Sequence, residues 1–192
     1  MGQFAENLSP RFFAGRMLLA MPGIGSPEFD QAAIALCVHD EHGALGIDIG
    51  KVIAGLSLRD LLANLDIDGE GLESVPVLRG GPVDPQRGFV LHSLDWGGQD
   101  AMQVNAHWGL SGSLDVLRAI AERRGPERYL VSLGYAGWDA GQLESEMKRH
   151  GWFLGDAFTP DVLAIPAQSR WAEAFAASGV DARLLAGTSG MA

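Results

Sequence analysis

The chain contains a single cysteine, Cys37, among its 192 residues. A framework of internal disulfide bonds is therefore excluded, and with it the class of small secreted proteins that depends on one. One free thiol fits a reducing compartment, so we expect a cytoplasmic protein.

Long apolar segments are also missing. The stretch FFAGRMLLAMP, residues 12–22, is interrupted by Arg16 and ends soon after at a proline, so it is too short to span a bilayer. It has neither the preceding basic region nor the cleavage site of a signal peptide. The start MGQFAE carries Glu6 where a myristoylation signal needs Ser or Thr. We therefore expect no membrane association.

Basic residues are scarce. Lys and Arg number 14 against 24 Asp and Glu, which gives a formal net charge of −10 at pH 7. A nucleic-acid groove needs a basic stripe. The densest candidate, RAIAERRGPERY at residues 118–129, is partly neutralised by Glu122 and Glu127. Direct nucleic-acid binding is therefore not expected.

The composition that remains is that of a globular protein, with 47% apolar and 20% charged residues. A chain of this length suits one domain over residues 1–192, with an ordered core from about residue 12 to about residue 185 and flexible termini.

Strands and helices alternate along the sequence. Residues 16–21 and 32–39 predict strands, separated by one helical turn that begins near Ser26. A helix should follow Ser57 as its N-cap, a second should follow Ser113 and end before Gly125, and a late helix should span residues 169–179. Short strands are predicted at residues 75–78, 88–93, 101–104, 107–110 and 128–133.

The segment GWDAGQLESEMKRHGW, residues 137–152, predicts a further helix with complete local signals. Asp139 as N-cap and Gln142 three residues later form a capping-box pattern. Trp138 and Leu143 are spaced as a hydrophobic staple, and Gly151 supplies the end of the helix.

The stretch LCVHDEHGALGIDIGK, residues 36–51, predicts a hairpin with a four-residue turn at residues 40–43. Counting back from this turn pairs His39 with Ala44, Val38 with Leu45, Cys37 with Gly46, Leu36 with Ile47 and Ala35 with Asp48. One face would then be bulky, and the other would be small and partly polar. The second face would hold Ala33, Ala35, Cys37, His39, Ala44, Gly46 and Asp48.

Three interpretations of Cys37 and His39 follow from this register. A metal site would use both residues, but the spacing lacks the paired ligands of zinc sites and the chain has no second cysteine. A reactive thiolate needs cationic neighbours, whereas the nearest charges in sequence are acidic. A small buried thiol in a sheet is the interpretation that the pattern favours. We expect no metal.

Apparent cofactor motifs are incomplete. GALGIDIGKV has Leu45 in place of the first glycine of a phosphate loop and Val52 in place of its Ser or Thr. GIGSPE, residues 23–28, lacks the third glycine of a dinucleotide fingerprint. We therefore expect no cofactor.

Four stretches together resemble the AlgH/YqgE family of bacterial proteins over nearly the whole chain: LLAMPGI, LCVHDEHGALGI, RGGPVDPQRGFVLHS and SLGYAGWDAGQLESEM. The most specific blocks are GGPV at residues 80–83 and GYAGW-x-x-GQLE at residues 134–144. The resemblance implies an α+β fold with a strongly bent, mostly antiparallel sheet that forms a partial barrel flanked by helices. The candidate binding residues in these blocks are Gly80, Gly81, Pro82, Gly134, Tyr135, Gly137, Trp138 and Gln142.

One departure from the family stands out. Where the family usually continues with Asn-Arg-Pro after the hairpin, this chain has Gly50, Lys51 and Val52.

The resemblance implies a role in regulating transcription and no established activity. We expect a non-enzymatic regulatory protein that binds a protein or small-molecule partner, and a homo-oligomer stays open. The alternative is a thiol- or histidine-dependent enzyme or redox sensor centred on Cys37 and His39.

Overall fold

The computed structural model describes residues 12–186, and the termini that we expect to be flexible lie outside these residues. The strands are β1 (Arg16–Ala20), β2 (Ala33–Asp40), β3 (Gly43–Asp48), β4 (Val52–Ser57), β5 (Pro76–Arg79), β6 (Val83–Ser93), β7 (Met102–Gln103), β8 (Trp108–Ser111), β9 (Tyr129–Asp139) and β10 (Trp152–Ala157). The α-helices are α1 (Leu58–Asn64), α2 (Leu114–Ala121), α3 (Gln142–Lys148), α4 (Arg170–Ala177) and α5 (Ala182–Ala186). Three short 3₁₀ segments are η1 (Pro27–Phe29), η2 (Pro160–Ala164) and η3 (Ala167–Ser169).

The sheet runs in the order β10-β1-β2-β3-β9-β6-β8-β7, and β5 joins β4 to β9. All strand pairs are antiparallel except β5 with β9. The sheet curls through 217° into a half-barrel. The α+β fold with a bent sheet is therefore confirmed.

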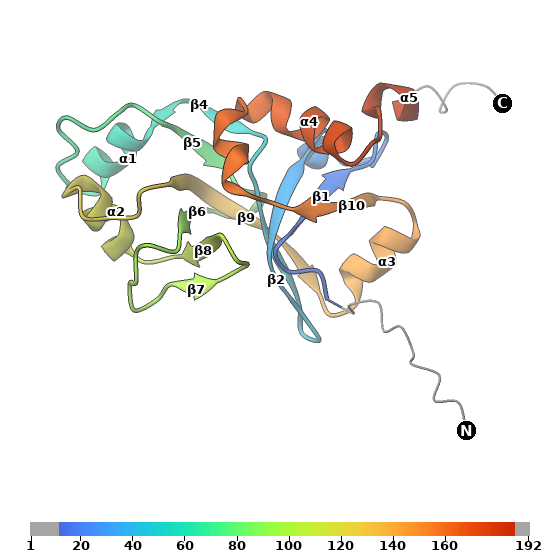
Figure 1. Cartoon of the computed structure of the whole chain (residues 1–192), viewed down its shortest axis with the longest axis horizontal. Coiled ribbons are helices and arrows are strands. Elements are labelled where there is room, and N and C mark those ends of the chain that lie inside the picture. The colour runs from blue at the N-terminus through green and yellow to red at the C-terminus, as the bar shows by residue number, and fades with distance from the viewer. Residues whose placement is uncertain (1–11, 187–192) are drawn as a thin grey trace.

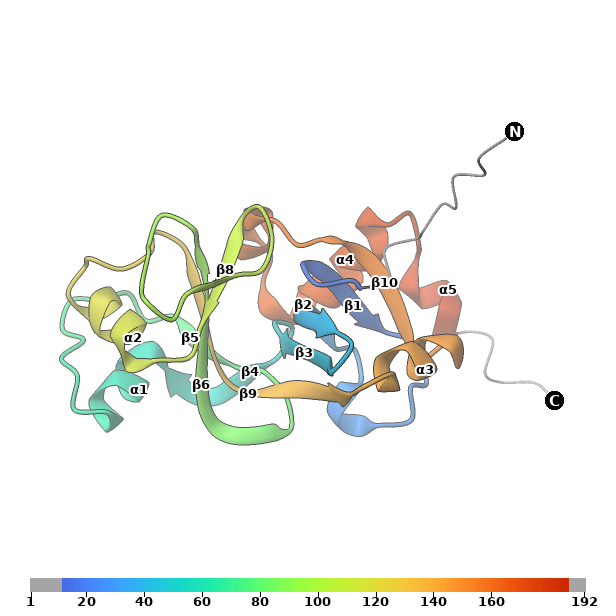
Figure 2. The ribbon, with the colours of Figure 1, turned by 90° about the horizontal axis from the view of Figure 1, so that it is seen from below.

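Strand β9 joins two lobes (Figures 1 and 2). Its first half, from Tyr129 to Leu133, pairs with β5 and β6, whereas residues Ala136–Asp139 pair with β3. Gly134 lies between the two halves with φ of +73°, a conformation that glycine adopts without strain. The first lobe contains β4–β8 with α1 and α2, and the second contains β1–β3 and β10 with α3–α5.

The buried core consists of three clusters. A central cluster includes Cys37, Ile47, Phe89, Trp108 and Phe175. The α3 cluster includes Leu36, Trp138, Leu143 and Trp152. The α1–α2 cluster includes Leu61, Val90, Val116, Leu117 and Val131.

Helix α4 is anchored by polar contacts as well. Arg170 Nη1 donates to Ile49 O at 2.7 Å, and Trp171 Nε1 donates to Ala20 O at 2.9 Å.

Among residues 12–186, no helix is both long and apolar enough to cross a membrane.

The predicted capping of the helix after Trp138 is wrong. Helix α3 begins at Gln142 behind Gly141, and Asp139 is the last residue of β9, where it pairs with Gly43. Sheet pairing with β3 therefore extends the strand through the expected cap. Part of the expected contact survives, because Gln142 Oε1 accepts from Asp139 N at 2.9 Å. The sequence also missed two strands, β4 and β10.

Ser57 and Ser113 both occupy the predicted N-cap positions, but only Ser57 forms a side-chain capping hydrogen bond. Ser57 Oγ accepts from Asp60 N at 3.3 Å, and the Asp60 carboxylate accepts from Ser57 N at 2.9 Å. Ser113 forms no side-chain cap bond. Instead Asp100 Oδ2 accepts from Gly112 N at 3.1 Å and from Ser113 N at 3.0 Å.

We expect Ser57→Ala to lower the free energy of unfolding by about 1 kcal/mol, the usual cost of losing a cap. Ser113→Ala should change it by less than about 0.5 kcal/mol, because no cap bond is lost. Chemical denaturation of both variants measures the difference. Equal losses would show that Ser113 also stabilises its helix.

Candidate functional site

The hairpin register changes at Cys37. The structure pairs His39 with Ala44 and Val38 with Leu45 as predicted, but beyond Cys37 it pairs Leu36 with Gly46 and Ala35 with Ile47. Cys37 is the extra residue of a β-bulge, so the predicted Cys37–Gly46 pair is wrong. A shift of one residue exchanges the faces of a strand. The predicted division into one bulky and one small face is therefore wrong too, and both faces are buried.

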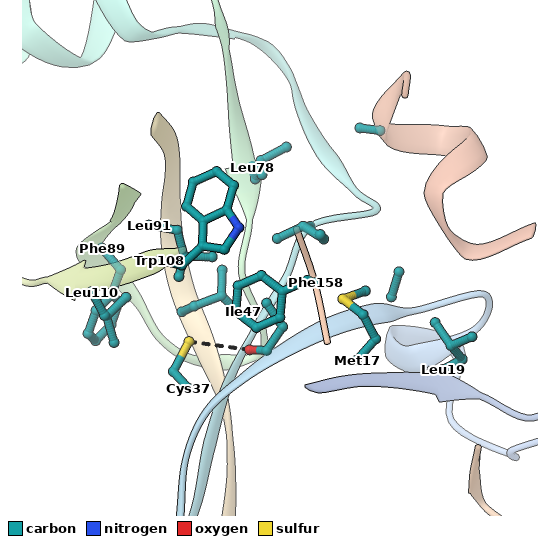
Figure 3. Close-up of a cluster of buried hydrophobic side chains, with 14 of the residues drawn as sticks. Met17, Leu19, Cys37, Ile47, Leu78, Phe89, Leu91, Trp108, Leu110 and Phe158 are labelled. Atoms are coloured by element: carbon teal, nitrogen blue, oxygen red, sulfur yellow. Dashed lines mark hydrogen bonds between the residues drawn. The ribbon is translucent and has the colours of Figure 1, made fainter. Parts of the chain in front are cut away.

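Cys37 lies in the central cluster among Ile47, Trp108 and Phe158 (Figure 3). Its side chain donates to Ala35 O at 3.3 Å, and the residue is 3% exposed. Burial raises the pKa of the Cys37 thiol far above its ordinary value. The thiol is therefore protonated and shielded from solvent.

His39 lies against different residues. Its Nδ1 accepts from Phe13 N at 3.1 Å, so Nε2 carries the hydrogen and donates to Glu144 Oε1 at 3.2 Å. Phe13 packs with the α3 cluster, whereas Cys37 belongs to the central cluster. Cys37 and His39 are predicted to share one face of the hairpin, but their side chains pack against different clusters. Both ring nitrogens of His39 form hydrogen bonds within the fold.

Glycines of the two family motifs meet where the turn between β5 and β6 crosses β9. A Cβ atom on Gly80 would lie 2.2 Å from Gly134 O, and one on Gly81 would lie 2.1 Å from the carbonyl carbon of Tyr135. A Cβ atom on Gly134 would lie 2.5 Å from Gly81 O. Side chains are therefore excluded at all three positions. We call this contact the glycine crossing.

The other motif residues pack elsewhere. Trp138 is 6% exposed, and its Nε1 donates to Glu146 Oε2 at 3.0 Å. Gln142 Nε2 donates to Glu146 Oε1 at 2.9 Å. Gly137 packs beside the ring of Tyr135, which contacts Phe89 edge-on. These four candidates support the folded structure and do not line the cleft described next.

A cleft of about 420 Å³ adjoins the glycine crossing. Gly81 and Pro82 are the two motif candidates that line it. The corner between β3 and β4 contributes Asp48 and Lys51, and η1 contributes Glu28 and Phe29. The remaining lining residues are Ile53, Arg79, Pro85 and Leu133.

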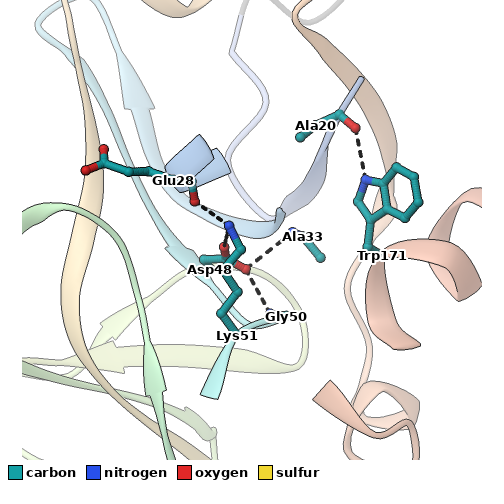
Figure 4. Close-up of polar contacts among 7 residues, drawn as sticks. All are labelled: Ala20, Glu28, Ala33, Asp48, Gly50, Lys51 and Trp171. Carbon is teal, nitrogen blue, oxygen red and sulfur yellow. Dashed lines mark hydrogen bonds and ion pairs between the residues drawn. The ribbon is translucent and has the colours of Figure 1, made fainter. Parts of the chain in front are cut away.

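Asp48 and Lys51 form the polar corner of this cleft (Figure 4). Asp48 is 2% exposed, and its Oδ1 accepts from Gly50 N at 2.8 Å and Ala33 N at 3.3 Å. Lys51 Nζ lies 3.7 Å from Asp48 Oδ2 and donates to the carbonyl oxygen of Glu28. Burial raises the pKa of Asp48 to about 6, although the Gly50 hydrogen bond and the Lys51 charge oppose the shift.

Arg79 supplies the second cation of the cleft. It directly precedes Gly80, is exposed, and forms no ion pair within residues 12–186. Arg79, Glu28 and Phe29 are not among the binding residues predicted from the sequence. The position of Arg79 next to the GGPV block was a signal that could have found it.

A family model and two relatives match nearly the whole of this chain. A family model described as AlgH-like matches residues 17–183. This chain is a member of the AlgH-like family. A UPF0301 protein of Novosphingobium aromaticivorans is 52% identical over 181 residues, which cover 94% of this chain and 97% of the relative. One from Rhizorhabdus wittichii is 50% identical and covers 96% of this chain and 99% of the relative.

Solved structures show the same fold. The solution structure of the AlgH protein from Pseudomonas aeruginosa aligns over 100% of both chains with a TM-score of 0.75 and 36% identity. A Corynebacterium diphtheriae protein shares the fold with a TM-score of 0.69 at 15% identity, over 90% of this chain and 91% of that one. The AlgH-like match at residues 17–183 includes every residue that lines the cleft.

We expect Cys37 to react slowly with thiol reagents in the native state at neutral pH and rapidly after unfolding, because the thiol is buried and protonated. Cys37→Ser should lower the free energy of unfolding by about 1–2 kcal/mol, since the buried hydroxyl can still donate to Ala35 O. Labelling with and without denaturant checks the first expectation. Native labelling as fast as that of a free thiol would contradict it.

Asp48 should make stability depend on pH. Between its ordinary pKa of 3.8 and the value of about 6, the folded protein keeps a proton that the unfolded chain has released. The free energy of unfolding therefore falls as the pH rises through this range. Asp48→Asn stays neutral and can still accept from Ala33 and Gly50, so it should lack this contribution.

Urea unfolding of both proteins between about pH 4 and 7 isolates Asp48, because other titrating groups largely cancel in the difference. The wild-type protein should lose stability relative to Asp48→Asn as the pH rises. A difference that does not change with pH would contradict the raised pKa.

Proposed function

We propose that this AlgH-like protein is a non-enzymatic binding protein that takes a small anionic organic ligand in the cleft beside the glycine crossing. The observation that carries the proposal is the pair of cations, Lys51 and Arg79, in one cleft of a chain whose net charge is −10. A ligand with a carboxylate or phosphate group and an apolar body matches these surroundings.

The two cations differ in availability. Arg79 is exposed and has no acidic partner in the described chain, so its guanidinium can form a two-pronged contact with a carboxylate or phosphate. Lys51 is held near the cleft by Asp48 and by the Glu28 carbonyl, and its side chain is 26% exposed. Figure 4 shows the Glu28 carboxylate pointing away from this ammonium, so Asp48, at 3.7 Å, is the acidic partner of Lys51.

Size and lining also favour small-molecule binding. A volume of about 420 Å³ lies in the range of roughly 300–1,000 Å³ that is typical of ligand pockets. Phe29, Ile53, Pro82, Pro85 and Leu133 provide apolar surface. The described residues that line the cleft include no serine, threonine, cysteine or histidine, so they supply no hydroxyl or thiol nucleophile with a histidine base.

A regulatory role would then act through the ligand. The acidic chain disfavours direct contact with nucleic acid. We propose that any effect on transcription passes through the ligand-bound protein and a protein partner.

Binding of benzoate and phenyl phosphate tests the proposal, with benzamide as the uncharged counterpart of benzoate. We expect both anions to bind and to shift the NMR signals of Gly81 and Ile53, whereas benzamide should bind at least tenfold more weakly. Arg79→Gln should weaken anion binding about tenfold, the typical loss for a hydrogen bond to a charged group.

Arg128→Gln is the matched control, since Arg128 is an exposed arginine outside the cleft. It should leave binding unchanged. Failure of both anions to bind, or equal effects of Arg79→Gln and Arg128→Gln, would contradict the proposal.

A further inference from the structure

The polar corner of the cleft contains a carboxylate whose two oxygens have different partners. Asp48 Oδ1 accepts from the backbone N–H groups of Gly50 and Ala33, so this oxygen is committed to the fold. Asp48 Oδ2 faces the Lys51 ammonium, and 3.7 Å separates Oδ2 from Nζ. Because Asp48 is only 2% exposed, its charge acts on the cleft through Lys51.

The Lys51 ammonium has a second partner, which does not titrate. It donates to the backbone carbonyl oxygen of Glu28, and this contact is the same whether Asp48 is ionised or protonated. The ammonium has further hydrogens to donate, and the side chain is 26% exposed, so a ligand in the cleft can reach it. The Glu28 contact therefore fixes where the positive charge lies, and Asp48 decides how much of it is neutralised.

The other charged groups near Asp48 do not share this role. The Glu28 carboxylate points away from the ammonium (Figure 4). Arg79 lines the cleft but forms no ion pair within residues 12–186, and Arg170 of α4 donates to the carbonyl oxygen of Ile49. The described residues that line the cleft include no histidine. Asp48 is thus the group that can change the charge of the cleft near neutral pH.

The two protonation states of Asp48 present different charges to a ligand. Because burial raises its pKa to about 6, the carboxylate is ionised at about pH 8 and mostly protonated at about pH 5. The ionised carboxylate pairs with Lys51, so Arg79 is then the unpaired cation of the cleft. Protonation removes the acidic partner of Lys51, and the cleft then offers both cations.

We infer that Asp48 determines which anions the cleft prefers: monoanions when it is ionised, and dianions when it is protonated and Lys51 is free to contact a second anionic group. This inference rests on the proposed function of the cleft. Asp48 is a positioning residue here, because it acts through Lys51 and need not touch the ligand.

Anion binding and protonation of Asp48 must then strengthen each other. A bound anion disfavours the ionised carboxylate and raises its pKa, so binding takes up a proton. Affinity is therefore highest below about pH 6 and falls as the pH rises through the pKa of the free protein toward that of the complex. The total change is about tenfold for each unit by which the anion raises the pKa.

Benzenesulfonate and benzene-1,3-disulfonate are the probes, because the charge of a sulfonate does not change between about pH 5 and pH 8. We expect calorimetric titration of the full-length protein to show the disulfonate binding about tenfold more tightly at pH 5 than at pH 8, the effect of one pKa unit. Benzenesulfonate should change by a smaller factor. Titrations in two buffers of different ionisation enthalpy should show proton uptake between about pH 6 and pH 7.

Asp48→Asn cannot ionise and can still accept from Gly50 and Ala33. It should bind the disulfonate tightly at both pH values without proton uptake. Glu28→Gln is the matched control, since it removes a carboxylate that lines the same cleft but points away from Lys51. It should keep the pH dependence of the wild-type protein.

Three results would overturn this inference alone while benzoate still binds: a wild-type affinity for the disulfonate that does not change with pH, a pH dependence that survives in Asp48→Asn, or one that disappears in Glu28→Gln. Failure of the disulfonate to bind would also overturn it. Failure of benzoate and phenyl phosphate to bind would overturn the proposed function, and this inference with it.

Discussion

The close contact of two backbone segments at the glycine crossing is the constraint on which the rest of the structure depends. The turn between β5 and β6 lies directly on β9, because the three glycines have no Cβ atoms to separate the chains. Hydrogen bonds from Asp48 N to Gly80 O and from Gly80 N to Leu133 O, both 2.8 Å, then join β3, the turn and β9. Gly134 bends β9 at the same place and divides its pairing between the two lobes. A side chain at any of these positions would separate the segments that form the cleft wall.

The bulge at Cys37 has a comparable effect on the second lobe. By inserting one unpaired residue, it lets Ala33, Ala35 and Cys37 share the central cluster with Ile47 and Ile49. Ile34 and Leu36 then fill the α3 cluster on the other face. The hairpin is buried on both faces for this reason. The chemistry of the thiol follows from the same placement, since a sulfur in an apolar core has no cation or base to activate it.

Two carboxylates and two cations line the cleft. In the cleft, the buried carboxylate of Asp48 is unfavourable by itself, and two backbone N–H groups and the Lys51 ammonium offset part of that cost. Lys51 pairs with Asp48, which leaves Arg79 as the cleft cation that forms no ion pair within residues 12–186.

The sequence by itself determined the family, the α+β class and several local elements. Glycine and proline punctuation, the leucine spacing after Ser57 and the GGPV and GYAGW blocks are local signals, and local signals survive folding where no tertiary contact opposes them. The tertiary structure decided the rest. Sheet pairing carried β9 through the expected cap at Asp139, and a bulge that no local pattern predicts separated the side chains of Cys37 and His39. Ser113 lies at the N-cap of its helix without the side-chain hydrogen bond of a cap. The cleft joins residues from η1, the β3–β4 corner and the β5–β6 turn, which are distant in sequence and meet only because the sheet bends at the glycine crossing.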